Sequence, residues 1–248
     1  MCPALSSKSS AIEYFGISET GFVRSNNEDV WSAIPKKQFF ILADGMGGHK
    51  AGEIASSFAV ESMCASINAL PMKIDVEEAC QGLREAIAKA NSKVFDESHN
   101  HAEYAGMGTT LSCFIVLENF LIYGHIGDSR LYRYRNRLEQ LTEDHSLRHT
   151  LWNKEEASAA PTLLLRNVIT RAIGTQPSVL PDIGVIACRS KDLYMICSDG
   201  LSDYVEEDKI ARILSSSQSL KEMGKNLVEL ALEKGGNDNI TLLLVRIL

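Results

Sequence analysis

The sequence predicts an α+β fold in which β-sheets are covered by α-helices. Short apolar or alternating runs, typical of strands, occur in consecutive blocks, and segments with helical spacing are grouped between those blocks. This order differs from the regular strand–helix alternation of folds built on parallel sheets. The chain has 248 residues, of which 45% are hydrophobic, so it can form a substantial core.

The predicted strands are short runs that are apolar throughout or alternate in polarity. In chain order they cover residues 12–17, 29–34, 39–43, 109–117, 120–126, 131–134, 183–187, 193–197 and 240–247. Glu118 and Asn119 separate two of these runs and predict a tight hairpin turn.

The predicted helices show apolar residues at intervals of three and four. In the first, Ile54, Ala55, Phe58, Ala59 and Met63 follow this spacing. A second helix is expected over about residues 76–94, and a later pair over about 208–214 and 220–233.

One domain over residues 11–248 is expected, because no linker-like composition or repeat interrupts this range. The Ser-rich segment 1–10 is expected to be mobile, and it lacks the long apolar core of a secretory signal. No run approaches the ~18 consecutive apolar residues of a membrane span. The expected location is therefore the cytoplasm, without membrane contact.

Charge and cysteine content exclude further classes. The net charge of −7 argues against a nucleic-acid binder, which usually carries a basic surface. No two cysteines form a C-x-x-C pair, so reduced thiols, mostly buried, are expected rather than disulfides, zinc ligands or nucleophiles. The cysteines are Cys2, Cys64, Cys80, Cys113, Cys188 and Cys197.

An aspartate beside glycine recurs at the ends of apolar runs. Asp44, Asp128 and Asp199 each follow such a run, and Asp238 precedes one. A single case is explained by the turn chemistry of aspartate and glycine. Repeated cases also indicate rigidly held carboxylates, which suit hard cations such as Mg²⁺ or Mn²⁺. If these strand ends converge, repulsion among the acids would be costly without a cation.

Six motifs occur in the order found in PP2C-type phosphatases, and the chain resembles the bacterial-style members of that family. The motifs are Arg24-Ser25-Asn26-Asn27-Glu28-Asp29, Asp44-Gly45-Met46-Gly47-Gly48, Gly108-Thr109-Thr110, Gly127-Asp128-Ser129-Arg130, Ser198-Asp199-Gly200 and Asp238-Asn239-Ile240-Thr241. The resemblance covers residues 12–247. It implies a central antiparallel β-sandwich flanked by helices, in α-β-β-α layers, with a binuclear metal centre at one end.

The resemblance also implies ligands for two metal ions. Asp44 matches the aspartate that bridges both ions, and the carbonyl of Gly45 matches a backbone ligand of one of them. Asp199 and Asp238 match carboxylate ligands of the other ion. Glu28 matches an acid that holds metal-bound water.

Two further residues complete the implied site. Asp128 matches a residue that, with Asp199, can bind a third ion in bacterial members. Arg24 matches the phosphate-binding arginine, whose guanidinium suits two phosphate oxygens at once.

The implied reaction is hydrolysis of phosphoserine or phosphothreonine on proteins by a water shared between two cations, Mn²⁺ or Mg²⁺. The implied partners are phosphorylated proteins, including a Ser/Thr kinase and its substrates, and a monomer is expected. Two alternatives stay open: a catalytically weak pseudophosphatase that binds phosphoproteins, and a phosphatase for small metabolites. The complete set of matched ligands speaks against the first, and a comparison of substrates would test the second.

The proton donor to the leaving group is unassigned. Met46 occupies the position at which some family members have histidine, and His49 is the nearest histidine. His49 is either this acid or a structural anchor of its loop, and a metal-bound water is the alternative donor.

Residues 145–166 only partly match the flap that family members carry beside the active site, which predicts a different substrate choice. His145 and His149 are expected to form an exposed pair on a helix rather than a zinc site. The glycine-rich run 45–52 lacks the spacing of a nucleotide-binding loop.

Overall fold

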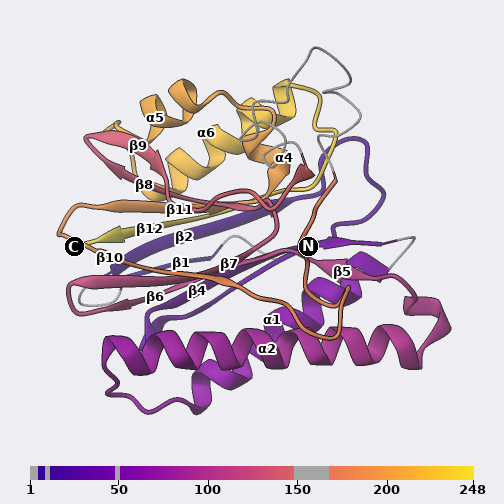
Figure 1. The fold of residues 1–248 in the computed structure, drawn as a ribbon. Coiled ribbons are helices and arrows are strands. Elements are labelled where there is room, and N and C mark those ends of the chain that lie inside the picture. Colours follow the sequence, from indigo (N-terminus) through magenta and orange to yellow (C-terminus); the bar gives the residue numbers. More distant parts are fainter. Residues whose placement is uncertain (1–4, 9–11, 48–50, 148–167) are drawn as a thin grey trace.

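Two antiparallel β-sheets pack face to face, and helices cover the outer face of each sheet (Figure 1). The structure is a computed structural model that describes residues 5–8, 12–47, 51–147 and 168–248. The layers follow the order helix, sheet, sheet, helix. This arrangement confirms the expected α+β class and the α-β-β-α sandwich.

The first sheet has the strand order β1-β2-β12-β11-β8-β9. Its strands are β1 (Leu5–Lys8), β2 (Ile12–Glu19), β12 (Ile240–Ile247), β11 (Leu193–Cys197), β8 (Arg130–Arg135) and β9 (Arg137–Gln140). The strand β1 pairs with β2 inside the segment expected to be mobile, and the mobility of that segment stays a prediction.

The second sheet has the order β10-β7-β6-β4-β3, with β5 paired to β4. Its strands are β10 (Asp182–Ala187), β7 (Phe120–Ile126), β6 (Leu111–Leu117), β4 (Phe39–Met46), β3 (Asp29–Ile34) and β5 (Gly108–Thr109). The turn between β6 and β7 is the predicted one, and Glu118 adopts a left-handed φ of 52° there.

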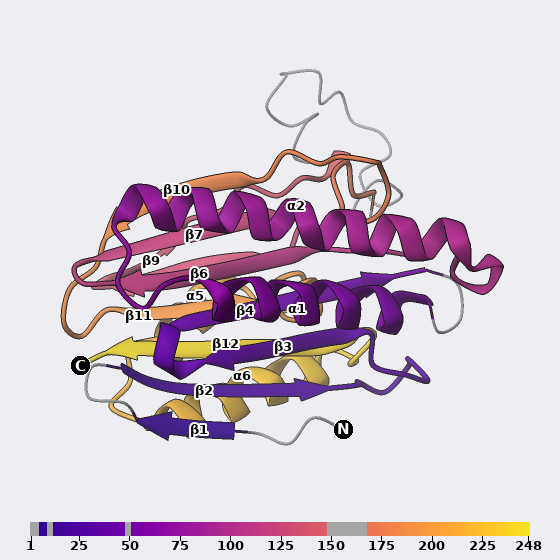
Figure 2. The same ribbon diagram turned by 90° about the horizontal axis from the view of Figure 1, so that it is seen from below.

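Two long helices cover the second sheet, and shorter helices cover the first (Figures 1 and 2). The helices are α1 (Ala51–Ala69), α2 (Val76–Asn100), α4 (Asp199–Ser202), α5 (Glu207–Leu214) and α6 (Leu220–Glu233), with 3-10 turns η1 (Pro35–Lys37) and η2 (Ala102–Tyr104). Capping boxes begin α2 at Asp75 and α6 at Ser219, where each side chain satisfies a free backbone N–H. None of the described helices combines the length and the apolar character needed to cross a bilayer.

Side chains of β4 alternate between two cores, because neighbouring strand residues point to opposite faces. Phe39, Ile41 and Ala43 pack toward α1 and α2, whereas Phe40 and Leu42 pack between the two sheets. All five are essentially inaccessible to solvent. Packing on both faces fixes the end of β4, which carries Asp44.

Strands near the two ends of the chain lie side by side. In the β2–β12 pair, Glu19 lies opposite Ile240, and in the β11–β12 pair, Cys197 lies opposite Leu242. Three connections therefore leave the sheet at the same end, on the right in Figure 2. They are the connections that follow β2 and β11 and the connection that precedes β12. This register brings Arg24, Asp199 and Asp238 to one end of the sandwich.

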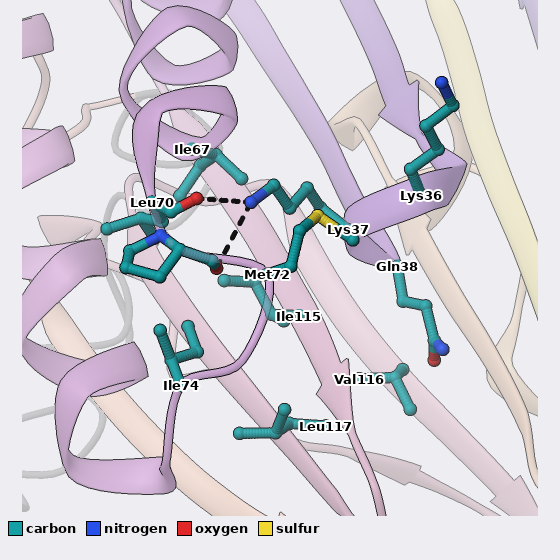
Figure 3. A pocket seen from close by; sticks show the side chains of 11 residues that line it. Lys36, Lys37, Gln38, Ile67, Leu70, Met72, Ile74, Ile115, Val116 and Leu117 are labelled. Atoms are coloured by element: carbon teal, nitrogen blue, oxygen red, sulfur yellow. Dashed lines mark hydrogen bonds between the residues drawn. The ribbon is translucent and has the colours of Figure 1, made fainter.

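A small pocket of about 90 Å³ lies at the opposite end, beside the connection between α1 and α2 (Figure 3). Lys37 donates hydrogen bonds there to the backbone carbonyls of Leu70 and Pro71. The last carbonyls of a helix lack partners within the helix and favour a nearby cation. No acidic side chain is among the described residues that line this pocket, so it contributes to structure rather than to the acidic site.

Candidate active site

One cavity of about 190 Å³ lies at the end of the sandwich where the connections after β2 and β11 and the connection before β12 leave the sheet. All the site residues expected from sequence line it: Arg24, Glu28, Asp44, Gly45, Asp128, Asp199 and Asp238. The chain segments that carry them are separated by up to 214 residues. The predicted convergence of distant carboxylates is therefore present in the structure.

Two threonines hold the backbone of Asp44 by hydrogen bonds. The Asp44 N–H donates to Oγ1 of Thr110 at 2.9 Å, and the Asp44 carbonyl accepts from the Thr110 N–H at 2.8 Å. The Thr109 hydroxyl donates to the same carbonyl at 2.9 Å. The predicted strand 109–117 is consequently interrupted at Thr110, between β5 and β6. The Gly108-Thr109-Thr110 motif thus positions Asp44.

Asp29 is a buried carboxylate that sequence reasoning left without a role. It lies directly opposite Asp44 in the β3–β4 pair, and its Oδ2 accepts a hydrogen bond from Oγ of Ser198 at 2.8 Å. Burial raises the pKa of Asp29 to about 6, and the charge of Asp238 adds to this rise. The sequence could have indicated this position. If residues 29–34 and 39–44 form a hairpin closed by the pair Ile34 and Phe39, Asp29 lies opposite Asp44.

Burial and mutual repulsion disfavour ionisation of the most deeply buried acids of the cluster. The pKa of Asp44 is raised well above its ordinary value by burial and then by the charges of Asp29 and Asp199. The pKa of Asp199 is raised in the same way by burial, Asp128 and Asp238. Acids in this arrangement either keep protons or require a counter-charge.

The donor chemistry of the cavity fits a divalent cation. Among the described residues, Oδ1 of Asp128 and Oδ1 of Asp29 are buried without a hydrogen-bond partner. A side chain at Gly45 would place its Cβ 2.1 Å from the carbonyl oxygen of Gly52, so only glycine allows this close packing. Carboxylate and carbonyl oxygens of this kind are the ligands of Mg²⁺ and Mn²⁺.

The acids line the cavity without meeting at one point. Within residues 5–8, 12–47, 51–147 and 168–248, no three His, Cys, Asp or Glu side chains already form a set that could hold a metal ion. One reason is that Asp238 pairs with Arg24 at 2.8 Å. Side-chain rotations would therefore accompany ion binding.

Arg24 lies at the rim of the cavity, and its side chain is 49% exposed. Its Nη2 donates to Oδ2 of Asp238 at 2.8 Å. The loop that carries it is held by Asn239, whose Nδ2 donates to the carbonyls of Thr20 and Asn26 at 3.0 Å. Asn239 is a second residue that sequence reasoning left without a role, although it lies within a quoted motif.

His145 supports the loop that carries Asp128. Gly127 has a φ of +106°, and its N–H donates to Nδ1 of His145 at 3.1 Å. This bond leaves the proton on Nε2, which lies 2.9 Å from Oδ2 of Asp182. Burial lowers the pKa of His145.

The expectation of an exposed histidine pair on a helix is wrong for His145. Its side chain is 3% exposed and lies outside any helix. The reason is tertiary, since the ring fills the space between Gly127 and the distant Asp182. His49, His149 and all but the first three residues of the flap segment 145–166 lie outside the described residues, so the predictions on the proton donor and the flap stay open.

The described cysteines are free thiols, as expected. Cys113, Cys188 and Cys197 are buried, and Cys64 and Cys80 are half-buried. Burial raises the pKa values of Cys113 and Cys197 to about 12, which keeps these thiols neutral.

Comparison with known proteins points to one family. The family described as protein phosphatase 2C matches residues 23–241. The chain is 36% identical over 236 residues to a serine/threonine phosphatase stp of Listeria monocytogenes, with 92% of each chain covered.

Solved structures agree with this match. The serine/threonine phosphatase PstP/Ppp of Mycobacterium tuberculosis superposes with a TM-score of 0.85 at 35% identity, covering 95% of this chain and 98% of that one. The catalytic domain of a phosphatase PstP, solved in complex with two manganese ions, also gives 0.85, at 34% identity and with 96% and 99% of the chains covered.

Proposed function

This chain belongs to the protein phosphatase 2C family of metal-dependent serine/threonine phosphatases, and we propose that its reaction takes place in the acidic cavity with two divalent cations. The proposed substrates are proteins that carry phosphoserine or phosphothreonine. The observation that carries the proposal is the convergence of carboxylates from distant parts of the chain around one cavity.

Specific residues would hold the ions. We assign Asp44 to both ions, with the carbonyl of Gly45 and the water-holding Glu28 beside one of them and Asp199 and Asp238 at the other. The unpartnered Oδ1 of Asp128 supports a third position shared with Asp199. A bound cation pair of this kind supplies a water of lowered pKa, oriented for in-line attack on phosphorus. The relative solved in complex with two manganese ions supports a pair of divalent ions, Mn²⁺ or Mg²⁺.

Arg24 would bind and orient the phosphate. Its guanidinium already lies at the rim of the cavity, where the bond to Asp238 holds it in place. A guanidinium can contact two phosphate oxygens in one plane, which orients the group and offsets its charge. If Asp238 held an ion instead of this bond, the Arg24 guanidinium would be free to make these contacts.

The test combines turnover with direct measurement of ion binding. Purified protein should hydrolyse para-nitrophenyl phosphate and phosphothreonine peptides with Mn²⁺, and EDTA should abolish both activities. Asp199→Asn should lower both the Mn²⁺ affinity measured by calorimetry and the rate of hydrolysis. Asp96 is an exposed aspartate on α2, and Asp96→Asn should change neither quantity.

Arg24→Ala should lower kcat/KM by the equivalent of about 2–4 kcal/mol, as for other preorganised electrostatic contacts. Its calorimetric Mn²⁺ affinity should fall much less than that of Asp199→Asn. Arg84→Ala, at an exposed arginine on α2, is the matched control.

Other outcomes would identify a different function. Phosphopeptide binding without turnover under several metals would favour a phosphoprotein-binding module. Turnover of small metabolites alone would favour a metabolite phosphatase. Wild-type rates in Asp199→Asn would contradict the proposed site.

We infer a cytoplasmic enzyme that opposes a Ser/Thr kinase, because the described cysteines are unpaired, as in reducing compartments. We also propose that it acts as a monomer, which sedimentation would test.

A further inference from the structure

Two exposed apolar side chains lie directly beside the proposed phosphate-binding arginine. Phe22 is 73% exposed and Val23 is 65% exposed, and both immediately precede Arg24 in the connection between β2 and β3. Scattered exposed apolar residues are ordinary on protein surfaces. A pair at the edge of an active-site cavity requires a different explanation, because exposed apolar patches often mark binding surfaces.

The backbone of this connection is held firmly against the turn before β12. The Phe22 N–H donates to the carbonyl of Gly236 at 2.7 Å. Gly21 has a φ of +79°, and a Cβ there would lie 2.4 Å from the carbonyl oxygen of Asp238. These contacts fix the backbone that carries the two side chains relative to the cavity.

The Phe22 ring packs on one side only. A Cβ built on Gly236 would lie 2.9 Å from Cδ2 of Phe22, so the ring rests above this glycine. The high exposure of Phe22 shows that the rest of the ring faces solvent. The ring is therefore supported by the protein but not covered by it.

A second apolar residue adjoins another wall of the cavity. Ile169 lines the cavity, and its neighbour Val168 is 43% exposed. Arg24 is the only cation among the described residues that line the cavity, and the other charged lining residues are all acidic. The surroundings of the phosphate site thus favour apolar neighbours of a phosphorylated residue over acidic ones.

We propose that Phe22 and Val23, here called the apolar platform, bind an apolar side chain of the substrate protein within two positions of the phosphorylated residue. This inference rests on the proposed function and narrows its substrate class. Consecutive Cα atoms are about 3.8 Å apart, and an extended peptide advances about 3.3 Å per residue. When the phosphate contacts Arg24, the platform therefore lies within reach of the first or second flanking side chain.

The test is a peptide series assayed with Mn²⁺. Four positions are varied one at a time: the two before and the two after the phosphothreonine. At the varied position, the peptide carries leucine, serine or glutamate. Rates are normalised to each variant's own rate on para-nitrophenyl phosphate, which has no flanking residues. The variants are Phe22→Ser, Val23→Ser and the double variant. Met72→Ser, at a 68% exposed methionine in the connection between α1 and α2, is the matched control.

The wild-type protein should prefer leucine over serine at one or more positions by roughly tenfold in kcat/KM, the scale of small apolar contacts in a binding site. The double variant should lower this ratio toward one, mainly through KM, and Met72→Ser should retain it. Thermal melting of each variant checks that the fold is intact, and the exposure of both residues predicts little change.

Two failures would be distinguishable. A wild-type protein that hydrolyses all peptides with equal efficiency, or a double variant that keeps the leucine preference, would overturn the platform alone. A wild-type protein inert toward both para-nitrophenyl phosphate and phosphopeptides would overturn the proposed function together with it.

Discussion

Replacing Asp128 with asparagine should stabilise the metal-free protein at alkaline pH, although we propose Asp128 as an ion ligand. The side chain is buried, and its Oδ1 is one of the buried oxygens without a partner among the described residues. The charges of Asp144 and Asp203 add to the unfavourable environment. Asparagine has nearly the same shape and no charge, so it removes the repulsion without leaving a cavity.

The magnitude follows from the pKa of Asp128, which burial raises from 3.8 to about 6. A rise of about two units corresponds to roughly 3 kcal/mol of unfolding free energy. Well below pH 3.8 the carboxyl is protonated in the folded and unfolded states alike, so no penalty arises. The penalty grows as pH rises from about 4 to about 6 and is complete above that range, because folding then buries an ionised group.

The assay is unfolding in EDTA at pH 4.5 and pH 8, by urea and by heat. At pH 8, Asp128→Asn should raise the melting temperature by about 5–10 °C, and at pH 4.5, about a third of the way between the two pKa values, the gain should be about a third as large. Asp96→Asn should show no comparable dependence on pH. Added Mn²⁺ should reverse the order at pH 8, because ion binding stabilises the wild-type protein more strongly.

Two results would refute the reasoning. Lower stability of Asp128→Asn at pH 8 would mean that the ionised carboxylate is stabilised by contacts other than those described. An equal gain at both pH values would mean that charge is not the cause.

Three further substitutions test the support of the site and of the fold. Thr110→Val removes the acceptor of the buried Asp44 N–H and should cost about 1–3 kcal/mol in urea unfolding, together with weaker Mn²⁺ binding by calorimetry. Gly45→Ala should abolish phosphatase activity and lower the melting temperature, because its Cβ would lie 2.1 Å from the Gly52 carbonyl oxygen; unchanged activity would show that this backbone can shift freely. Lys37→Met removes the hydrogen bonds to the carbonyls that follow α1 and should lower the free energy of unfolding by about 1 kcal/mol, while kcat/KM stays unchanged. A fall in kcat/KM would contradict the separation of that pocket from the active site.

Local patterns predicted most of the strands and helices because burial in this fold follows local periodicity. Both β4 and β12 are buried on two faces, so nearly all of their residues are apolar, and such a run is easily recognised in the sequence. The helix α6 begins and ends at the predicted residues. The break at Thr110 was missed because it depends on a distant partner, Asp44. The edge strand β1 was missed although it pairs with the neighbouring β2, because its Ser-rich sequence lacks an apolar pattern.

The residues that line the cavity were predictable as a set, whereas the position of His145, which supports one of their loops, was not. Family motifs identified the cavity-lining acids, and the structure places them together. The burial of His145 could not be foreseen, because Asp182 is 37 residues away in the chain. Asp29 was accessible to reasoning through hairpin register, since a carboxylate opposite Asp44 follows from where the two strands meet.

The pairing of β2 with β12 sets a limit on when catalysis can begin during synthesis of the protein. Arg24 leaves the ribosome early, but its partner Asp238 lies 214 residues later, immediately before β12. Contacts of such large sequence separation form late and depend on nearly the whole chain. A nascent chain that still lacks β12 has most of its sheets and helices encoded but not the contacts that hold the proposed phosphate site, so dephosphorylation should report completion of folding rather than its onset.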